Sequence, residues 1–272
     1  MIVRFISTFQ QPATGRLPRR LPSVARPYLY LFSAWLLSLI ALPIVKVWWG
    51  MPAVTWGISL SVVLQAGLVL FVLQQAWGWG RTAWAALIVA VLGLVIEAIG
   101  TATGLPFGRY TYTEALQPQL AHVPLLIPLA WLMMMPPAWA VAQRIAGPGP
   151  ASRLSFIGLS ALAMTAWDLF LDPQLVAWGF WVWAEPGGYF GIPWLNFFGW
   201  ALTAALMTVV VRPAPLPAGP LLTIYGLTWI LETIGLLVFW GLPGPALVGF
   251  AVMGSLLWLA VKDLVFKRQV RS

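Results

Sequence analysis

Residues 84–100 read WAALIVAVLGLVIEAIG, and residues 221–240 read LLTIYGLTWILETIGLLVFW. Each stretch is long and apolar enough to cross a lipid bilayer as a helix. Each also carries one carboxyl group, on Glu97 in the first EAIG string and on Glu232 in the similar ETIG string. A carboxyl group inside a membrane span is energetically costly and usually functional. The two stretches therefore predict a membrane fold and a buried acidic site within it.

The composition places the whole chain among helical membrane proteins. Hydrophobic residues make up 61% of it and charged residues only 8%, whereas average soluble chains are about 25% charged. The absence of cysteine and the single histidine exclude disulfides, thiolate nucleophiles and metal sites of several cysteines or histidines. The sequence also has no glycine-rich phosphate loop and no nucleotide fingerprint. We expect no metal, no cofactor and no nucleic-acid partner.

Eight apolar runs are each long enough for a transmembrane helix. They cover residues 28–45, 53–77, 83–100, 123–143, 154–171, 193–211, 220–240 and 244–261. We therefore expect an all-α, polytopic transmembrane helical bundle that forms one domain over residues 28–262. Residues 1–27 hold several arginines among prolines and are predicted to form a flexible basic cytoplasmic tail, and residues 263–272 a second basic tail.

The distribution of basic residues orients these spans. With the N-terminus inside, thirteen of the fifteen lysines and arginines fall on the inner side, and only Lys46 and Arg109 fall outside. Cytoplasmic loops carry such an excess of basic residues. Both termini are therefore expected in the cytoplasm, in a multi-pass protein of the cell membrane.

The acidic residues have the opposite distribution. Six of the seven lie in the outer halves of spans or in outer loops: Glu97, Glu114, Asp168, Asp172, Glu185 and Glu232. Six acids facing two bases cannot all have an ionic partner, and burial and like charges favour the neutral form of a carboxyl group. A carboxyl group that holds its proton near neutral pH can act as a general acid.

Glu97 and Glu232 also suggest an internal repeat. They lie about half a chain apart, and each is followed by a segment with glycine and proline. We read this as a possible four-helix unit used twice in the same orientation, an arrangement that commonly places a site at the repeat interface. The alternative is that short matches recur by chance in apolar sequence.

The string WDLFLDP at residues 167–173 is the sharpest motif. Asp168 and Asp172 are four residues apart, so they share one face of a helix. Two carboxyl groups that close titrate as a coupled pair. Pro173 is expected to mark the end of that helix. The alternative reading is that Asp172 only terminates the helix at the membrane interface.

Two loops complete the outer side. Residues 101–122 form a long loop of the kind that often serves as a lid or binding segment. Residues 173–193 contain no lysine or arginine but many aromatic residues. Such residues usually form the aromatic belt at the lipid headgroups, but this cluster is dense enough for a re-entrant or in-plane segment. Aromatic walls suit a flat, conjugated, apolar substrate and stabilise carbocations through their π faces.

Four stretches together resemble one known family: residues 97–112, 123–131, 167–173 and 189–200. It is the membrane-integral carotenoid biosynthesis family that contains the CruF-type carotenoid 1′,2′-hydratases and the bisanhydrobacterioruberin hydratases. The resemblance covers roughly residues 28–262. It implies an enzyme that adds water to the terminal double bond of an acyclic carotenoid end group, without a cofactor, and gives a tertiary alcohol.

The resemblance also implies partners, whereas the roles of the candidate residues are our own hypotheses. The partners are an apolar carotenoid from the bilayer, water and membrane lipids. We expect Asp168 to donate the proton with Asp172 tuning it, and Glu97 and Glu232 to orient water. Arg109 and Tyr112 would close the outer side. The substrate-binding candidates are Arg109, Tyr110, Tyr112, His122, Trp167, Trp181, Trp183 and Asn196.

Two other functions stay open at the level of sequence. A carotenoid cyclase would protonate the same end group and trap the cation with an internal alkene instead of water. A proton-coupled carrier would also use repeats and intramembrane carboxyl groups, but it needs polar residues through both halves of the membrane, and the cytoplasmic half shows few beyond Gln65, Gln74 and Gln75. The oligomeric state is not predicted.

Overall fold

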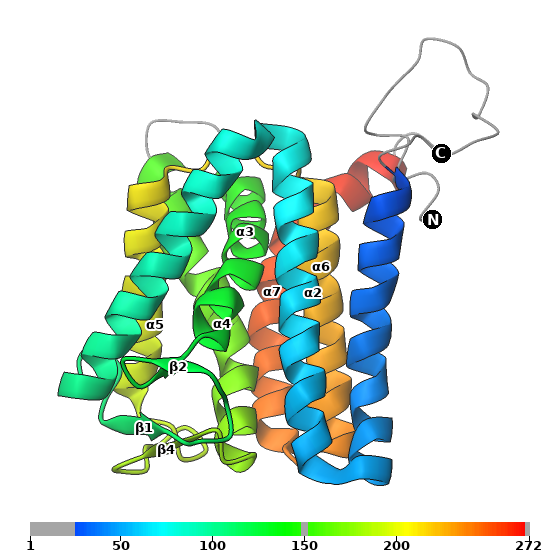
Figure 1. Cartoon of the computed structure of the whole chain (residues 1–272). Helices are drawn as coiled ribbons and strands as arrows, with labels where there is room; N and C mark the ends of the chain where they lie inside the picture. The colour runs from blue at the N-terminus through cyan, green and yellow to red at the C-terminus, as the bar shows by residue number, and fades with distance from the viewer. Residues whose placement is uncertain (1–24, 148–151, 270–272) are drawn as a thin grey trace.

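The computed structural model is a bundle of long helices with short strands at one end (Figure 1). It describes residues 25–147 and 152–269, so most of the first predicted tail, and residues 270–272 of the second, lie outside the described residues. The helices are α2 (Ala25–Thr103), α3 (Leu126–Ala146), α4 (Ser152–Ala177), α5 (Trp194–Val211), α6 (Ala218–Ile234) and α7 (Pro243–Gln269), with the π-helix η2 (Gly235–Phe239) after α6.

Helix α2 is folded back on itself twice. A straight helix of its 79 residues would be about 120 Å long, several times the roughly 30 Å thickness of a bilayer core. Gly50 and Gly78 adopt φ values of 74° and 76°, a conformation that glycine tolerates because it has no Cβ. They divide α2 into a first segment (25–49), a second segment (51–77) and a third segment (79–103), which run alternately up and down the bundle (Figure 1).

The helical membrane character that the sequence predicts is confirmed. Within the described residues, six helices are long and apolar enough to cross a membrane. The start of α2 and the end of α7 lie at the same end of the bundle, opposite the strands (Figure 1). The first tail was predicted to extend to residue 27, whereas α2 already begins at Ala25. The second tail was predicted at residues 263–272, and α7 continues into it as far as Gln269. The count of eight spans stays a prediction.

The prediction that a helix ends at Pro173 is wrong. Helix α4 continues through Pro173 to Ala177. Proline has no backbone N–H, so it cannot donate to the carbonyl oxygen four residues earlier, that of Leu169. The hydroxyl of Tyr189 donates to this oxygen at 2.9 Å instead. A side chain far along the sequence thus satisfies the carbonyl group that the proline leaves free.

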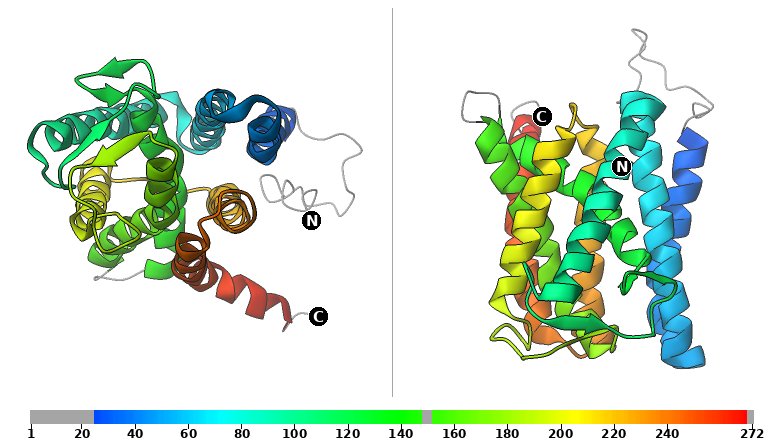
Figure 2. Two further views of the ribbon diagram at one scale, coloured as in Figure 1. Left: turned by 90° about the horizontal axis from the view of Figure 1, so that it is seen from below. Right: turned by 60° about the vertical axis from the view of Figure 1, so that its left-hand side comes forward.

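The expectation of a purely helical chain is also incomplete, because the two loops that were predicted on the outer side contain strands. Strand β1 (Tyr110–Tyr112) pairs antiparallel with β4 (Trp181–Trp183), and β2 (Gln119–Leu120) pairs with β3 (Val123–Pro124). The aromatic loop therefore forms a strand where a re-entrant or in-plane segment was predicted. The strands lie across one end of the helices (Figure 2), and Tyr110 lies opposite Trp183 and Tyr112 opposite Trp181.

Helix α3 lies at the centre of the bundle. In an apolar stretch of 18 residues in α3, 83% of the residues are buried, whereas 28% are buried in the corresponding stretches of α2 and of α7. Its Trp131 and Trp139 are fully buried. The first and second segments of α2 stand at the side of the bundle (Figure 2), where many of their apolar side chains are exposed, as suits contact with lipid.

Gly199 on α5 allows the chain after α2 to pack closely against the helices. A Cβ at this position would lie 2.6 Å from Cδ1 of Phe107 and 2.8 Å from the carbonyl oxygen of Pro106. We therefore expect Gly199→Ala to destabilise the protein by about 1–3 kcal/mol through overpacking. Its apparent melting temperature in detergent should fall by several degrees.

Gly67→Ala is the matched control, because nothing lies within 4 Å of a Cβ added at this helical position. Its melting temperature should equal or slightly exceed that of the wild type, since alanine favours a helix over glycine. Equal melting temperatures for the two variants would contradict the close packing at Gly199.

Candidate active site

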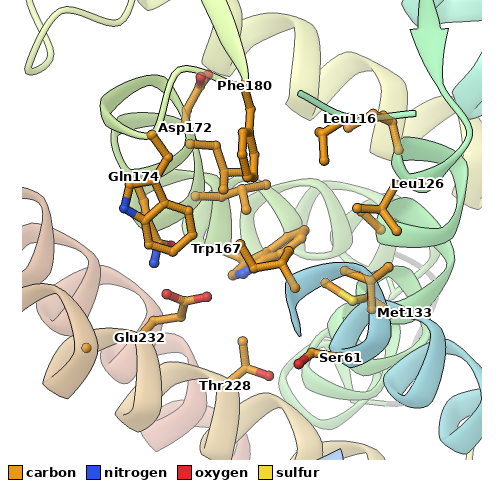
Figure 3. Close-up of a pocket in the computed structure, with 18 of the residues that line it drawn as sticks. Ser61, Leu116, Leu126, Met133, Trp167, Asp172, Gln174, Phe180, Thr228 and Glu232 are labelled. Carbon is orange, nitrogen blue, oxygen red and sulfur yellow. The ribbon is translucent and has the colours of Figure 1, made fainter. Parts of the chain in front are cut away.

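A cavity of about 310 Å³ opens between the helices beneath the strands. Side chains from all three segments of α2 and from α3, α4, α5 and α6 line it, and so do the strands β1 and β4. Most of these side chains are apolar or aromatic (Figure 3). Three carboxyl groups line it as well, those of Glu97, Asp172 and Glu232. The cavity therefore gathers acids from three helices in an apolar enclosure.

Glu97 is held by three hydrogen-bond donors. Tyr110 and Tyr112 of β1 donate their hydroxyls to Oε2 at 2.5 and 2.9 Å, and the indole N–H of Trp131 on α3 donates to Oε1 at 3.3 Å. An ionised carboxylate only accepts hydrogen bonds, so this set of donors suits a charged Glu97. The same bonds attach β1 to the helices.

The two tyrosines stay donors across the physiological pH range. Burial raises the pKa of both Tyr110 and Tyr112 well above its usual range, and the nearby charge of Glu97 raises it further. Their hydroxyls therefore keep their protons near neutral pH and can donate to Glu97.

Asp168 and Asp172 form a pair on α4, bridged by one amide. The side-chain nitrogen of Asn196 on α5 donates to Oδ2 of Asp168 at 2.8 Å and also to Oδ2 of Asp172. The indole N–H of Trp181 on β4 donates to Oδ1 of Asp172 at 2.7 Å. Oδ1 of Asp168 is buried without a partner among the described residues. Asp172 lines the cavity, and Asp168 does not.

Glu232 has a different environment from the other two lining carboxyl groups. It projects from α6 into the cavity (Figure 3) and is partly buried. Within the described part of the chain no hydrogen bond to its carboxyl group is formed, whereas Glu97 accepts three and Asp172 two. A carboxyl group without donors in apolar surroundings is suited to hold its own proton.

The charge and the aromatic walls define what the cavity can do. Among the described residues no lysine, arginine or histidine lines it. Trp131 stacks on Trp200 with 4.3 Å between ring centroids, and Trp167 meets Trp200 edge to face at 6.0 Å. Acids and π faces without bases repel anions and stabilise cations. The site suits an apolar molecule that becomes positively charged during a reaction.

The structure brings most of the predicted site residues together but not all of them. Asp168 does not line the cavity and is linked to it through Asn196, which donates to both Asp168 and Asp172. The other predicted residues missing from the lining are Arg109 and His122. Both are exposed, and Arg109 lines a second pocket with Thr101 and Thr103. No group of three or more His, Asp or Glu side chains in the described residues is placed to hold a metal ion.

Sequence reasoning missed several residues that line the cavity. Trp200 stands between Trp131 and Trp167, and Thr228 lies one turn before Glu232 on α6. The spacing of four residues between Thr228 and Glu232 puts both on one helix face. This spacing could have identified Thr228 as a candidate site residue from the sequence. No comparable signal marks Trp200, because tryptophan is abundant in this chain and usual at membrane interfaces.

Comparison with known proteins places the chain in a family. A bisanhydrobacterioruberin hydratase of Haloarcula japonica is 29% identical over 204 residues, which are 75% of this chain and 59% of that protein. The chain thus spans less than two thirds of the length of that relative. No solved structure matches the chain. The sequence profile of the family described as carotenoid biosynthesis protein matches residues 57–256, and the chain belongs to this family.

Proposed function

We propose that the protein is a carotenoid hydratase that adds water to the terminal C1′–C2′ double bond of an acyclic carotenoid end group, in carotenoid biosynthesis. The observation that carries the proposal is the cavity in which three carboxyl groups and a wall of tryptophans meet, with no basic side chain among the described residues that line it. Membership of the carotenoid biosynthesis family and the name of the Haloarcula japonica relative support it.

The size of the cavity fits one end of such a substrate. Its roughly 310 Å³ is near the lower limit for a drug-sized ligand, about 300 Å³, so a long polyene can insert only its end group. Ile40 on the first segment of α2 and Ile234 at the end of α6 both line the cavity and are 50% and 44% exposed. We propose that the polyene enters between them from the bilayer.

Glu232 is the proposed acid and base of the reaction. Its carboxylic acid transfers a proton to C2′, and a tertiary cation forms at C1′. A water molecule then attacks C1′ while the Glu232 carboxylate takes up a proton from that water. The alkene has gained one water, and Glu232 is protonated again, so one residue performs both proton transfers. This replaces Asp168, which does not line the cavity, as the proposed donor.

The other carboxyl groups are proposed to stabilise the cation. Glu97 and Asp172 are held in place by their donors and therefore act as fixed negative charges without rearrangement in the transition state. Trp131, Trp167 and Trp200 add their π faces. Asp168 and Asn196 are then positioning residues that support Asp172.

The proposed setting is a multi-pass protein of the cell membrane with eight spans, three of them the segments of α2. Both termini are proposed to be cytoplasmic, which puts the strands and the acidic cavity in the outer half. Lys46, one of the two outer bases, lies over the ring of Trp240 with 4.7 Å between Nζ and the centroid. This cation–π contact joins the first segment of α2 to the chain after α6, beside the proposed opening.

The first prediction concerns the product and its dependence on Glu232. The full chain, expressed in a bacterium that makes lycopene, should convert it to a more polar pigment heavier by one water, detected by mass spectrometry. Glu232→Gln should lower the yield by about 10²–10⁴-fold, the usual contribution of a general acid or base. Asp172→Asn should lower it too, and Asp168→Asn less, because Asp168 does not face the cavity.

Glu114→Gln is the matched control, since Glu114 is an exposed acid that accepts a hydrogen bond from Gln117 and does not line the cavity. It should keep the wild-type yield. Full activity of Glu232→Gln alongside an inactive Asp172→Asn would move the proton donor to α4. A product of unchanged mass but altered spectrum would indicate cyclisation, and unchanged lycopene and γ-carotene would rule out the proposed reaction.

The second prediction concerns orientation, and the chain is convenient for it because it has no cysteine. Glu114→Cys lies at the strand end of the bundle, and Gln75→Cys lies near Gly78 at the other end; both positions are exposed. In intact cells a membrane-impermeant maleimide should label Glu114→Cys alone. After lysis it should label both. The reverse pattern in intact cells would show that the termini are outside.

A further inference from the structure

One threonine of α6 differs from the other two. Thr223 and Thr233 donate their hydroxyls to backbone carbonyl oxygens one turn earlier, at 3.1 and 2.7 Å. Thr228 is 4% exposed, and its hydroxyl has no partner among the described residues. It also lines the cavity one turn before Glu232, whereas Thr223 and Thr233 do not. Its hydroxyl is therefore available to a ligand in the cavity.

A second polar group without a partner faces the same cavity. Trp167 on α4 is 1% exposed, and no acceptor for its indole N–H exists in the part of the chain described. Its edge-to-face contact with Trp200 fixes the ring. Figure 3 shows Thr228 and Glu232 on the α6 wall and the Trp167 ring across from them. Buried polar groups nearly always have a protein or water partner.

We infer that Thr228, Trp167 and Glu232 form a binding site for the water molecule that is added to the substrate. This rests on the proposed hydration. Water fits because an indole N–H can only donate, a hydroxyl can donate and accept, and a carboxyl group accepts, while an apolar polyene satisfies none of them. A bound water typically makes about three such hydrogen bonds in a protein.

The three partners leave the water reactive. Water has two hydrogens to donate and two lone pairs to accept or attack with. One hydrogen goes to Glu232 and the other to the Thr228 hydroxyl oxygen, and the Trp167 N–H occupies one lone pair. The second lone pair is left to form the C–O bond at C1′, and the hydrogen on Glu232 is the proton that the carboxylate removes. Thr228 and Trp167 are thus positioning residues for the nucleophile.

The test separates formation of the cation from its capture. Full-length protein in lipid vesicles that contain lycopene is incubated in D₂O. A cation captured by water gives the alcohol, whereas a cation that loses its original H from C2′ and keeps the added D returns to lycopene with deuterium at C2′. Thr228→Val keeps the shape without the hydroxyl, so the ratio of alcohol to deuterated lycopene should fall about tenfold, the size expected for one lost hydrogen bond.

The ratio is measured per cation formed, so it does not depend on how much variant protein folds. Thr228→Ser restores the hydroxyl and should restore the ratio. Thr233→Val removes a similarly buried hydroxyl, outside the cavity, from the same helix and should leave the ratio unchanged. Trp167→Phe should lower it.

Two results would overturn the inference in different ways. A wild-type ratio in Thr228→Val, or the same low ratio in Thr228→Val and Thr228→Ser, would remove the water site and leave the hydratase proposal intact. A wild-type protein that forms neither the alcohol nor deuterated lycopene would overturn the proposed hydration itself.

Discussion

The hydrogen bonds to Glu97 are the interaction on which the strand end of the structure depends. A carboxylate at membrane depth needs donors, because the lipid supplies none, and α2 cannot provide them from its own apolar face. They come from β1 and α3, through Tyr110, Tyr112 and Trp131. This requirement draws the loop after α2 inward as a strand, β4 pairs with that strand, and together they cover the cavity.

The cavity contains carboxyl groups in two kinds of environment. Glu97 and Asp172 are surrounded by donors that are themselves fixed by packing, whereas Glu232 lines the cavity with no hydrogen-bond donor among the described residues. Catalysis by fixed charges needs the first kind, and proton transfer to a substrate needs the second. A single apolar chamber with both is suited to make a carbocation and then quench it.

Much of the candidate site could be predicted from single residues, and the reasons are physical. Intramembrane acids are rare because they are costly, so Glu97, Asp172 and Glu232 stood out at once, and all three line the cavity. Asp168 was expected to donate the proton with Asp172 tuning it, yet Asp168 bonds to Asn196 and does not line the chamber. A spacing of four residues gives a shared helix face, but it does not say which member reaches the cavity.

By itself the sequence determined the helical membrane character and the identity of the costly polar groups, because hydrophobicity and helix length are local properties of the chain. Only the tertiary structure decided where α4 ends, since the Leu169 carbonyl that Pro173 leaves free is satisfied by Tyr189 from another part of the chain. It likewise decided that, within the part of the chain that the structure describes, Glu97 has three donors and Glu232 none. Donors and acceptors that meet across helices depend on packing, which no local pattern records.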